Sequence, residues 1–369
     1  MRHLLCVIMA ALSFAPACQS FGAEPASAPL RIAIAGLVHG HVAGCLGSNR
    51  TRTDIQIVGI AEPDEKLADR YAERYRLDRG LLFTRLDDML DKARPQAVLA
   101  YTNTLDHRAV VEACARRGIH VMMEKPLAVS IEDAQAIEKA ARASAIHVLV
   151  NYETTWYSNS RDVYDRVHGK SIGEIRKIVA HDGHRGPKEI GVGPEFLDWL
   201  TDPKLNGAGA LFDFGCYGAD LATWLLDGER PQTVTAVTQH IKPDIYPRVD
   251  DEATIIVTYP KTQVILQASW NWPYDRKDLE IYGQTGAIFT IGKNDLLLHR
   301  NGSTAEQIAA KPALAPYDNS VSYLKAVIAR DIKPDGPSSL ADNIIVTEIL
   351  DAARRSAATG KTVSLPAVK

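Results

Sequence analysis

Residues 31–46, RIAIAGLVHGHVAGCL, have most features of a turn that binds a dinucleotide. An apolar strand ends at Gly36, where glycine permits a tight turn, and a helix is expected to follow. The free N–H groups at the start of that helix would face a pyrophosphate. The usual pattern is G-x-G-x-x-G. Here Val38 and His41 occupy the second and third glycine positions, and Gly40 is an added glycine. The stretch therefore predicts a cofactor site with an altered glycine pattern.

Glu62 supports the same interpretation, because it ends the second predicted strand. A carboxylate at this place accepts hydrogen bonds from ribose hydroxyls and repels a 2′-phosphate, so it favours NAD over NADP. The alternative is that Glu62 is an exposed loop residue with no ligand.

Residues 102–128, TNTLDHRAVVEACARRGIHVMMEKPLA, resemble the Gfo/Idh/MocA oxidoreductases. In that family a T-P-N-x-x-H-like loop follows the fourth strand, and an E-K-P triplet closes the fifth. Thr102, Asn103 and His107 match the loop here, and residues 124–126 are the triplet. The resemblance extends from residue 30 to residue 366.

The stretch GAGALFDFGCYGADLATWLLDG resembles the family's second signature, D-x-G-x-H-x-x-D. Asp213, Gly215 and Asp220 match it, and Tyr217 occupies the usual histidine position. If this stretch is helical, Asp213, Tyr217 and Asp220 share one face.

The resemblance implies roles for three catalytic candidates. Lys125 matches the family's catalytic lysine, and we expect burial and a nearby cation to lower its pKa so that it exchanges a proton near neutrality. Tyr217 would relay a proton or anchor a hydroxyl, and Asp220 would bind the substrate. The alternatives are a lysine exposed in a turn and a tyrosine that only packs.

The resemblance also implies separate contacts for the cofactor and for the substrate. The cofactor is expected to contact Gly36, Val38, His39, Gly40, His41, Glu62, Thr102, Asn103, His107, Glu124 and Lys125. The substrate is expected to contact Asn151, His184, Arg185, Trp199, Asp213 and Tyr217, although core packing explains Trp199 equally well.

Two histidine pairs, His39 with His41 and His181 with His184, could suggest a metal. Residues three apart on a strand face opposite sides, which makes the second pair a poor chelate. No carboxylate or cysteine at a suitable spacing completes either pair, so no metal site is predicted.

The elements that position these residues belong to two regions. Strand and helix patterns alternate over 30–150, which predicts a Rossmann-type, doubly wound parallel sheet that binds NAD(P). Mostly strand patterns occupy 151–366, which predicts an α+β domain with a largely antiparallel open sheet for substrate binding and oligomerisation. A long helix over 340–358 is expected to pack back across both domains. The fold class is α/β.

Composition and the N-terminus limit the partners and the location. The formal net charge is −3, with no basic stripe, so nucleic acid and anionic membranes are not expected partners. Residues 1–23 have the pattern of a signal peptide, which predicts a periplasmic or secreted protein without a membrane span. Lipid attachment at Cys18 is a weaker alternative.

The expected function is NAD(P)-dependent oxidation or reduction of a hydroxyl of a sugar, polyol or cyclitol. Free nicotinamide cofactor is scarce outside the cytoplasm, so an exported enzyme would hold and recycle its cofactor. Two alternatives stay open: an NAD-dependent glycosidase or lyase that uses transient oxidation, and a sugar-binding relative without catalysis. We also expect a homo-oligomer formed through the open sheet.

Overall fold

The computed structural model describes residues 28–48 and 52–366, and contains two sheets. The predicted signal peptide and Cys18 lie outside the described residues. In the first sheet, all pairings are parallel and the order is β3-β2-β1-β4-β5-β6. Its strands are β1 (Leu30–Ala35), β2 (Ile55–Ala61), β3 (Leu82–Phe83), β4 (Ala97–Ala100), β5 (His120–Glu124) and β6 (Val148–Asn151). The predicted doubly wound parallel sheet is confirmed.

Helices flank this sheet, and local signals explain where several of them begin. The helices are α1 (Val42–Ser48), α2 (Glu65–Tyr75), α3 (Leu86–Ala93), α4 (His107–Ala115) and α5 (Ile131–Ser144). The side chain of Asp64 caps α2 by accepting from the N–H groups of Lys66 and Leu67. Ser130 caps α5 in the same way. Such caps satisfy N–H groups that a helix start would leave unpaired.

The second sheet has nine strands in the order β14-β13-β12-β11-β7-β10-β9-β8-β15. Its strands are β7 (Ile175–Gly183), β8 (Thr233–Gln239), β9 (Glu252–Thr258), β10 (Gln263–Ser269), β11 (Arg276–Gly283), β12 (Gly286–Ile291), β13 (Asp295–Arg300), β14 (Glu306–Ala309) and β15 (Val363–Ser364). Among the described strands of this sheet, β7 and β10 form the one parallel pair. The prediction of a largely antiparallel sheet is confirmed.

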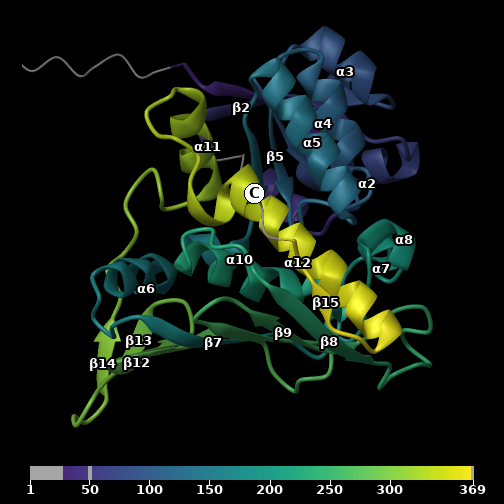
Figure 1. Cartoon of the computed structure of the whole chain (residues 1–369). Coiled ribbons are helices and arrows are strands. Elements are labelled where there is room, and N and C mark those ends of the chain that lie inside the picture. The colour runs from purple at the N-terminus through teal and green to yellow at the C-terminus, as the bar shows by residue number, and fades with distance from the viewer. Residues whose placement is uncertain (1–27, 49–51, 367–369) are drawn as a thin grey trace, which may run out of the picture.

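The remaining helices lie on one side of the second sheet or between the two sheets (Figure 1). They are α6 (Ser158–His168), α7 (Pro194–Leu200), α8 (Pro203–Asn206), α9 (Ala210–Asp213), α10 (Gly215–Leu225), α11 (Ser320–Ile328) and α12 (Leu340–Thr359), with short 3-10 turns at Arg79–Leu81, Glu153–Trp156 and Gly336–Ser338. α12 contacts β8 and α10 as well as α5 of the first domain. α11 packs against the first sheet, where Leu324 and Val327 join the core around Leu99.

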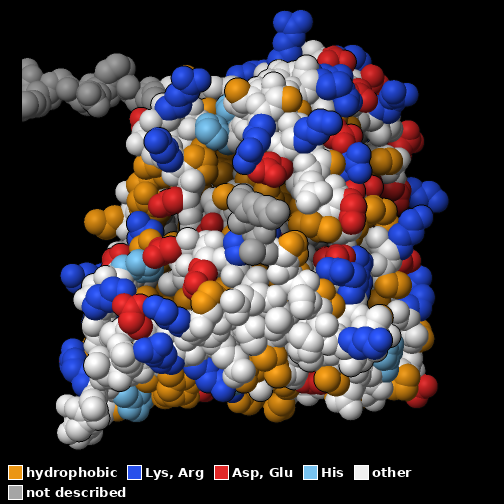
Figure 2. Space-filling model, viewed as in Figure 1, with side chains coloured by type: hydrophobic (Ala, Val, Ile, Leu, Met, Phe, Trp, Pro, Cys, Tyr) orange, Lys and Arg blue, Asp and Glu red, His pale blue; other side chains and the backbone are white. Residues whose placement is uncertain are grey.

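Charged side chains of both signs are interspersed on the face seen in Figure 2. None of the helices in the described part of the chain combines the length and apolar character that crossing a bilayer requires.

Candidate active site

Lys125 joins the two domains through an ion pair. It directly follows β5, and its Nζ lies 2.6 Å from Asp213 Oδ1 and 3.1 Å from the Asp213 carbonyl oxygen. Asp213 ends α9, and its other carboxylate oxygen accepts a hydrogen bond of 2.9 Å from the Trp270 indole N–H. The E-K-P triplet and the second signature therefore meet at one buried pair.

Asp213 sets the charge state of Lys125, which is only 6% exposed. Burial, the largest single effect, would lower the pKa of Lys125, but the charge and hydrogen bond of Asp213, together with Cys216 and Glu124, raise the pKa above its ordinary value. Burial would likewise raise the pKa of Asp213, and Lys125 lowers it instead. The expectation of a lowered lysine pKa is thus wrong for this structure, because the dominant neighbour is a carboxylate and not a cation.

Tyr217 of α10 lies between two lysines. Its ring centroid is 5.0 Å from Lys125 Nζ and 4.3 Å from Lys277 Nζ, so both cations face the aromatic ring. Lys277 in turn pairs with Glu153 at 2.6 Å. Burial raises the pKa of the Tyr217 phenol well above its ordinary value, and Lys277 opposes this only in part. Tyr217 therefore keeps its proton, and its hydroxyl is suited to donate a hydrogen bond and not to act as a base.

Asp220 is not brought to this cluster. Phe214 separates α9 from α10, so residues 213–220 are not one continuous helix. Asp220 is fully buried, and both of its carboxylate oxygens lack a partner among the described residues. Burial raises its pKa well above the ordinary value, and Asp342 of α12 adds to this effect. The structure thus buries Asp220, without a partner among the described residues, where a substrate contact was expected.

Four residues around Lys125 and Tyr217 were not predicted as site residues. They are Glu153, Asp182, Trp270 and Lys277. Asp182 and Lys277 are paired neighbours on β7 and β11. Asp182 is buried, which raises the pKa of its carboxyl well above the ordinary value although Lys277 opposes the shift. The pattern of single strands does not reveal this pairing, because cross-strand neighbours depend on the register of the sheet.

The opening turn retains the geometry of a phosphate-binding loop. Gly36 has φ +79°, and a Cβ there would lie 2.8 Å from Thr102 Cγ2. Within the described part of the chain, the N–H groups of Val38 and Gly40 find no acceptor. Gly40 itself is not crowded, since a Cβ would lie 3.5 Å from Phe196.

A cavity of about 350 Å³ adjoins this turn at the carboxyl ends of β1, β2 and β4. Its lining includes Gly36, Val38, Glu62, Thr102 and Asn103. Glu62 is held by the main chain: Oε2 accepts from the Leu37 N–H at 2.7 Å, and Oε1 accepts from the Asp64 N–H at 2.9 Å. A crevice at this edge of a doubly wound sheet is where such folds bind dinucleotides.

Two aromatic side chains expected to contact ligands are buried and hydrogen-bonded to the main chain. His107 is buried, and its Nδ1 lies 3.1 Å from the Pro126 carbonyl oxygen, so it holds the turn after Lys125. Trp199 is 5% exposed, and its indole N–H donates to the Val38 carbonyl at 3.2 Å. α7 thereby covers the glycine turn, with Trp199 and Phe196 against the His39 ring.

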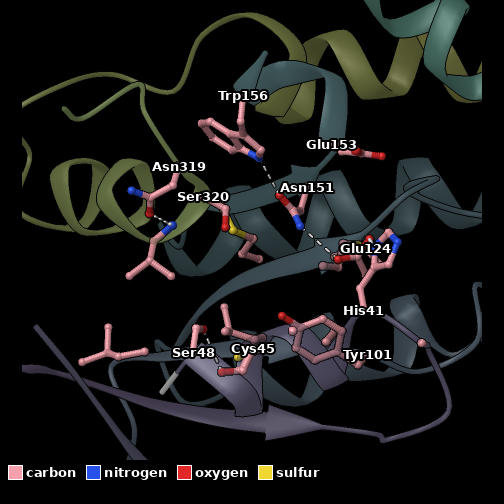
Figure 3. Close-up of a pocket in the computed structure, with 18 of the residues that line it drawn as sticks. His41, Cys45, Ser48, Tyr101, Glu124, Asn151, Glu153, Trp156, Asn319 and Ser320 are labelled. Atoms are coloured by element: carbon pink, nitrogen blue, oxygen red, sulfur yellow. Dashed lines mark hydrogen bonds and ion pairs between the residues drawn. The ribbon is translucent and has the colours of Figure 1, made fainter. Parts of the chain in front are cut away.

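A second cavity, of about 630 Å³, opens on the other side of the turn (Figure 3). At one end Trp156 donates to Asn151, which donates to Glu124, and each bond is 2.9 Å long. His41 Nδ1 lies 2.9 Å from the other Glu124 oxygen. Burial would raise the pKa of Glu124, but His41, His39 and Asn151 together lower it to about 2.

Glu124 therefore supplies the carboxylate that the His39–His41 pair was expected to lack. One donor atom from each of these residues lies within 4.8 Å of the other two. Sequence spacing could not show this, because 83 residues separate His41 from Glu124. The two histidines of the second pair have separate contacts: His181 of β7 contacts Gln267 and Glu280, whereas His184 follows β7 and packs its ring against Phe214.

The other expected substrate contacts are divided. Asn151 lines the larger cavity, and His184 packs against Phe214, the residue that follows Asp213. Arg185 is exposed, and its main-chain carbonyl accepts from Lys242. Asn103, an expected cofactor contact, is bound to Asp106 by two hydrogen bonds, at 2.8 and 3.0 Å.

Comparisons with known proteins agree with this architecture. Residues 30–152 match the oxidoreductase family with an NAD-binding Rossmann fold, and residues 160–289 match the GFO/IDH/MocA C-terminal domain. The inositol dehydrogenase homologue of Azotobacter vinelandii complexed with NAD+ superimposes with a TM-score of 0.79 at 18% identity, over 92% of this chain and 98% of that one. The aldose–aldose oxidoreductase of Caulobacter crescentus, complexed with glycerol, superimposes with a TM-score of 0.77 at 20% identity, over 91% of this chain and 100% of that one.

Two sequence relatives share about a quarter of their aligned residues with this chain. Trans-1,2-dihydrobenzene-1,2-diol dehydrogenase of Xenopus tropicalis is 26% identical over 220 residues, which are 58% of this chain and 61% of that protein. The chain thus spans about three fifths of the length of such relatives. 1,5-Anhydro-D-fructose reductase of Ensifer adhaerens is 24% identical over 84% of this chain and 91% of its own length. The two family matches, with both signatures meeting at Lys125 and Asp213, show that this chain belongs to the Gfo/Idh/MocA oxidoreductase family and carries its NAD-binding Rossmann domain.

Proposed function

We propose that this protein transfers hydride between NAD and a carbon that bears a hydroxyl or carbonyl group in a sugar, polyol or cyclitol. The observation that carries the proposal is the buried contact of 2.6 Å between Lys125 and Asp213. It supports a proton-exchanging role for Lys125, because this lysine lies between the Rossmann domain and the second signature.

The residues around the turn fit NAD. The free N–H groups of Val38 and Gly40 suit a pyrophosphate, and the cavity beside Glu62 suits the adenosine ribose. The Glu62 carboxylate disfavours a 2′-phosphate, so NAD is preferred over NADP. When bound, NAD supplies the hydride acceptor or donor.

Lys125 and Asp213 handle the proton. Because Asp213 raises its pKa, Lys125 carries a proton in the resting protein and can donate it to a carbonyl oxygen that becomes a hydroxyl. Oxidation of a hydroxyl is the reverse reaction. Lys125 must then start without its proton, so that it can accept the proton of the substrate hydroxyl. Asp213 acts as a positioning residue, since it fixes the lysine through Nζ.

Relatives and side-chain chemistry support a polyhydroxylated substrate. The relatives include an anhydrofructose reductase, and structural neighbours include an inositol dehydrogenase homologue. The polar groups of Asn151 and Glu153 line the larger cavity beside Trp156, a combination that binds hydroxyls and apolar sugar faces.

Location and assembly complete the proposal. The N-terminal pattern supports export, and an exported enzyme would hold its NAD tightly and recycle it between two substrates. The side of the second sheet opposite α10 and α12 has no helix over it in Figure 1, and it carries the half-buried side chains of Val179, Ile256 and Ile265. We expect this side to pair with a second copy, and a monomer in light scattering would contradict that expectation.

The test begins with the purified mature protein. It is denatured, the released nicotinamide dinucleotide is quantified, and the refilled protein is assayed with aldoses, polyols and cyclitols in both directions. We expect stoichiometric NAD and turnover that Lys125→Met lowers by about 10²- to 10⁴-fold without loss of NAD binding. Failure to bind added NAD would reject the proposal. Bound NAD with bond cleavage and no net redox change would favour a glycosidase or lyase.

A further inference from the structure

We propose that His39, His41 and Glu124 form a binding site for a divalent transition-metal ion. Both histidines lie in the turn after β1, with His41 at the third glycine position of the usual pattern, and Glu124 begins the E-K-P triplet. The site needs neither NAD nor a substrate, so its existence is independent of the proposed function.

The geometry is that of three ligands around one point. His41 Nδ1 lies 2.9 Å from Glu124 Oε2, and His39 Nε2 lies 4.0 Å from the same oxygen. The three donor atoms lie within 4.8 Å of one another. Tetrahedral ligands at about 2.0–2.2 Å from one ion are about 3.3–3.6 Å apart, so on binding the 2.9 Å contact must lengthen and the wider pairs must close.

His39 gives the independent indication of a ligand. Its side chain is 2% exposed, and its Nε2 has no hydrogen-bond partner among the described residues. A buried polar atom without a partner is costly and calls for an explanation. Phe196 and Trp199 pack against the ring at centroid distances of 4.7 and 5.7 Å, so the ring is held with Nε2 on the Glu124 side.

Neighbouring residues orient the remaining ligands. Asn151 donates to Glu124 Oε1 at 2.9 Å, which leaves Oε2 directed at the two histidines. Carboxylates and imidazoles that bind metals are commonly held by such outer hydrogen bonds. His39 Nδ1 accepts a 3.3 Å hydrogen bond from the His41 N–H. Metal binding at Nε2 requires the proton on Nδ1, so this long contact must be given up and the turn must adjust.

The donor set selects the class of ion. Two imidazoles and one carboxylate suit zinc and its first-row neighbours, whereas magnesium and calcium prefer oxygen ligands. The His41 side chain is 48% exposed and, with Glu124, lines the 630 Å³ cavity, so the coordination positions not filled by protein face that cavity. Water or an oxygen of a bound molecule would complete the shell there.

The experiment measures Zn²⁺ binding to the full chain after chelator treatment, by calorimetry and equilibrium dialysis without NAD. We expect one ion per chain. His41→Ala and Glu124→Gln should weaken binding by at least about tenfold. His41 lies at the surface, so its variant should keep the fold, which circular dichroism would check. His168→Gln is the matched control, because His168 also contacts a carboxylate, Asp227 at 2.7 Å, without a second histidine.

Co²⁺ gives a second readout that does not depend on activity or on small differences in stability. Visible absorption of the Co²⁺-loaded chain should show nitrogen and oxygen ligation and should disappear in His41→Ala but persist in His168→Gln. Zn²⁺ binding that is equal in the wild type and in His41→Ala would overturn the proposal. So would a folded wild type that binds no ion at micromolar free Zn²⁺.

Discussion

The Glu62 carboxylate accepts the main-chain N–H of Leu37 at 2.7 Å, and this contact links the end of β2 to the glycine turn. The same side chain lines the cavity of about 350 Å³. One residue thus shapes the turn and presents negative charge to the cavity.

Glu62→Gln tests the charge separately from the shape. The amide oxygen can still accept from Leu37, but the amide nitrogen cannot accept from Asp64, which leaves one main-chain N–H unpaired at a cost of about 1–3 kcal/mol. We expect lower stability in urea and a loss of the preference for NAD over NADP. Titrating both cofactors against the wild type and the variant checks this, and an unchanged preference would show that Glu62 does not read the ribose.

Gly36→Ala should damage the turn, whereas Gly40→Ala should not. At Gly36 the backbone has φ +79° and the new Cβ would meet Thr102 at 2.8 Å, so about 1–3 kcal/mol of strain is expected. At Gly40 the Cβ would make an ordinary 3.5 Å contact with Phe196. NAD binding by fluorescence and thermal unfolding of both variants measure the difference. Equal losses in the two variants would contradict the assigned geometry.

Local patterns predict the fold because each element carries its own signal. Alternating strands and helices specified the parallel sheet, and the long helix near the C-terminus is α12, which contacts elements of both domains. The two signatures also located Lys125 and Asp213, since a family motif preserves positions that meet in space.

Tertiary pairings escaped prediction because they depend on register and on chain distance. Asp182 and Lys277 meet only because β7 and β11 pair in one register. Glu124 ends β5, and His41 lies in the turn after β1. The two side chains meet because only β4 separates β1 from β5 in the sheet. The face shared by Tyr217 and Asp213 was inferred for a continuous helix, and the break at Phe214 separates α9 from α10.

Asp220→Asn distinguishes a buried acid from a substrate contact. Its pKa is raised in the folded state, so the wild type loses stability as the pH rises above about 3.9, the unfolded value, by about 1.4 kcal/mol per pH unit until the folded pKa is reached. Asparagine does not titrate, so the variant should gain stability relative to the wild type as the pH rises above about 3.9. Urea unfolding at several pH values measures this. A large fall in kcat with no such gain would restore Asp220 to the substrate site.

Asp213→Asn should move the proton chemistry of Lys125 to lower pH. Without the carboxylate, burial dominates and the pKa of Lys125 falls. Lys125 then loses the proton needed for carbonyl reduction at a lower pH than in the wild type. The variant also leaves a buried lysine without its charged partner, and breaking such a pair should cost about 3–5 kcal/mol. In the pH profile of kcat/KM for reduction, measured with NADH, the basic limb should move to lower pH.

Trp270→Phe is the control, because it removes the 2.9 Å indole hydrogen bond to Asp213 but keeps the negative charge, and its profile should shift less. Identical profiles in the wild type and in Asp213→Asn would mean that another group supplies the proton.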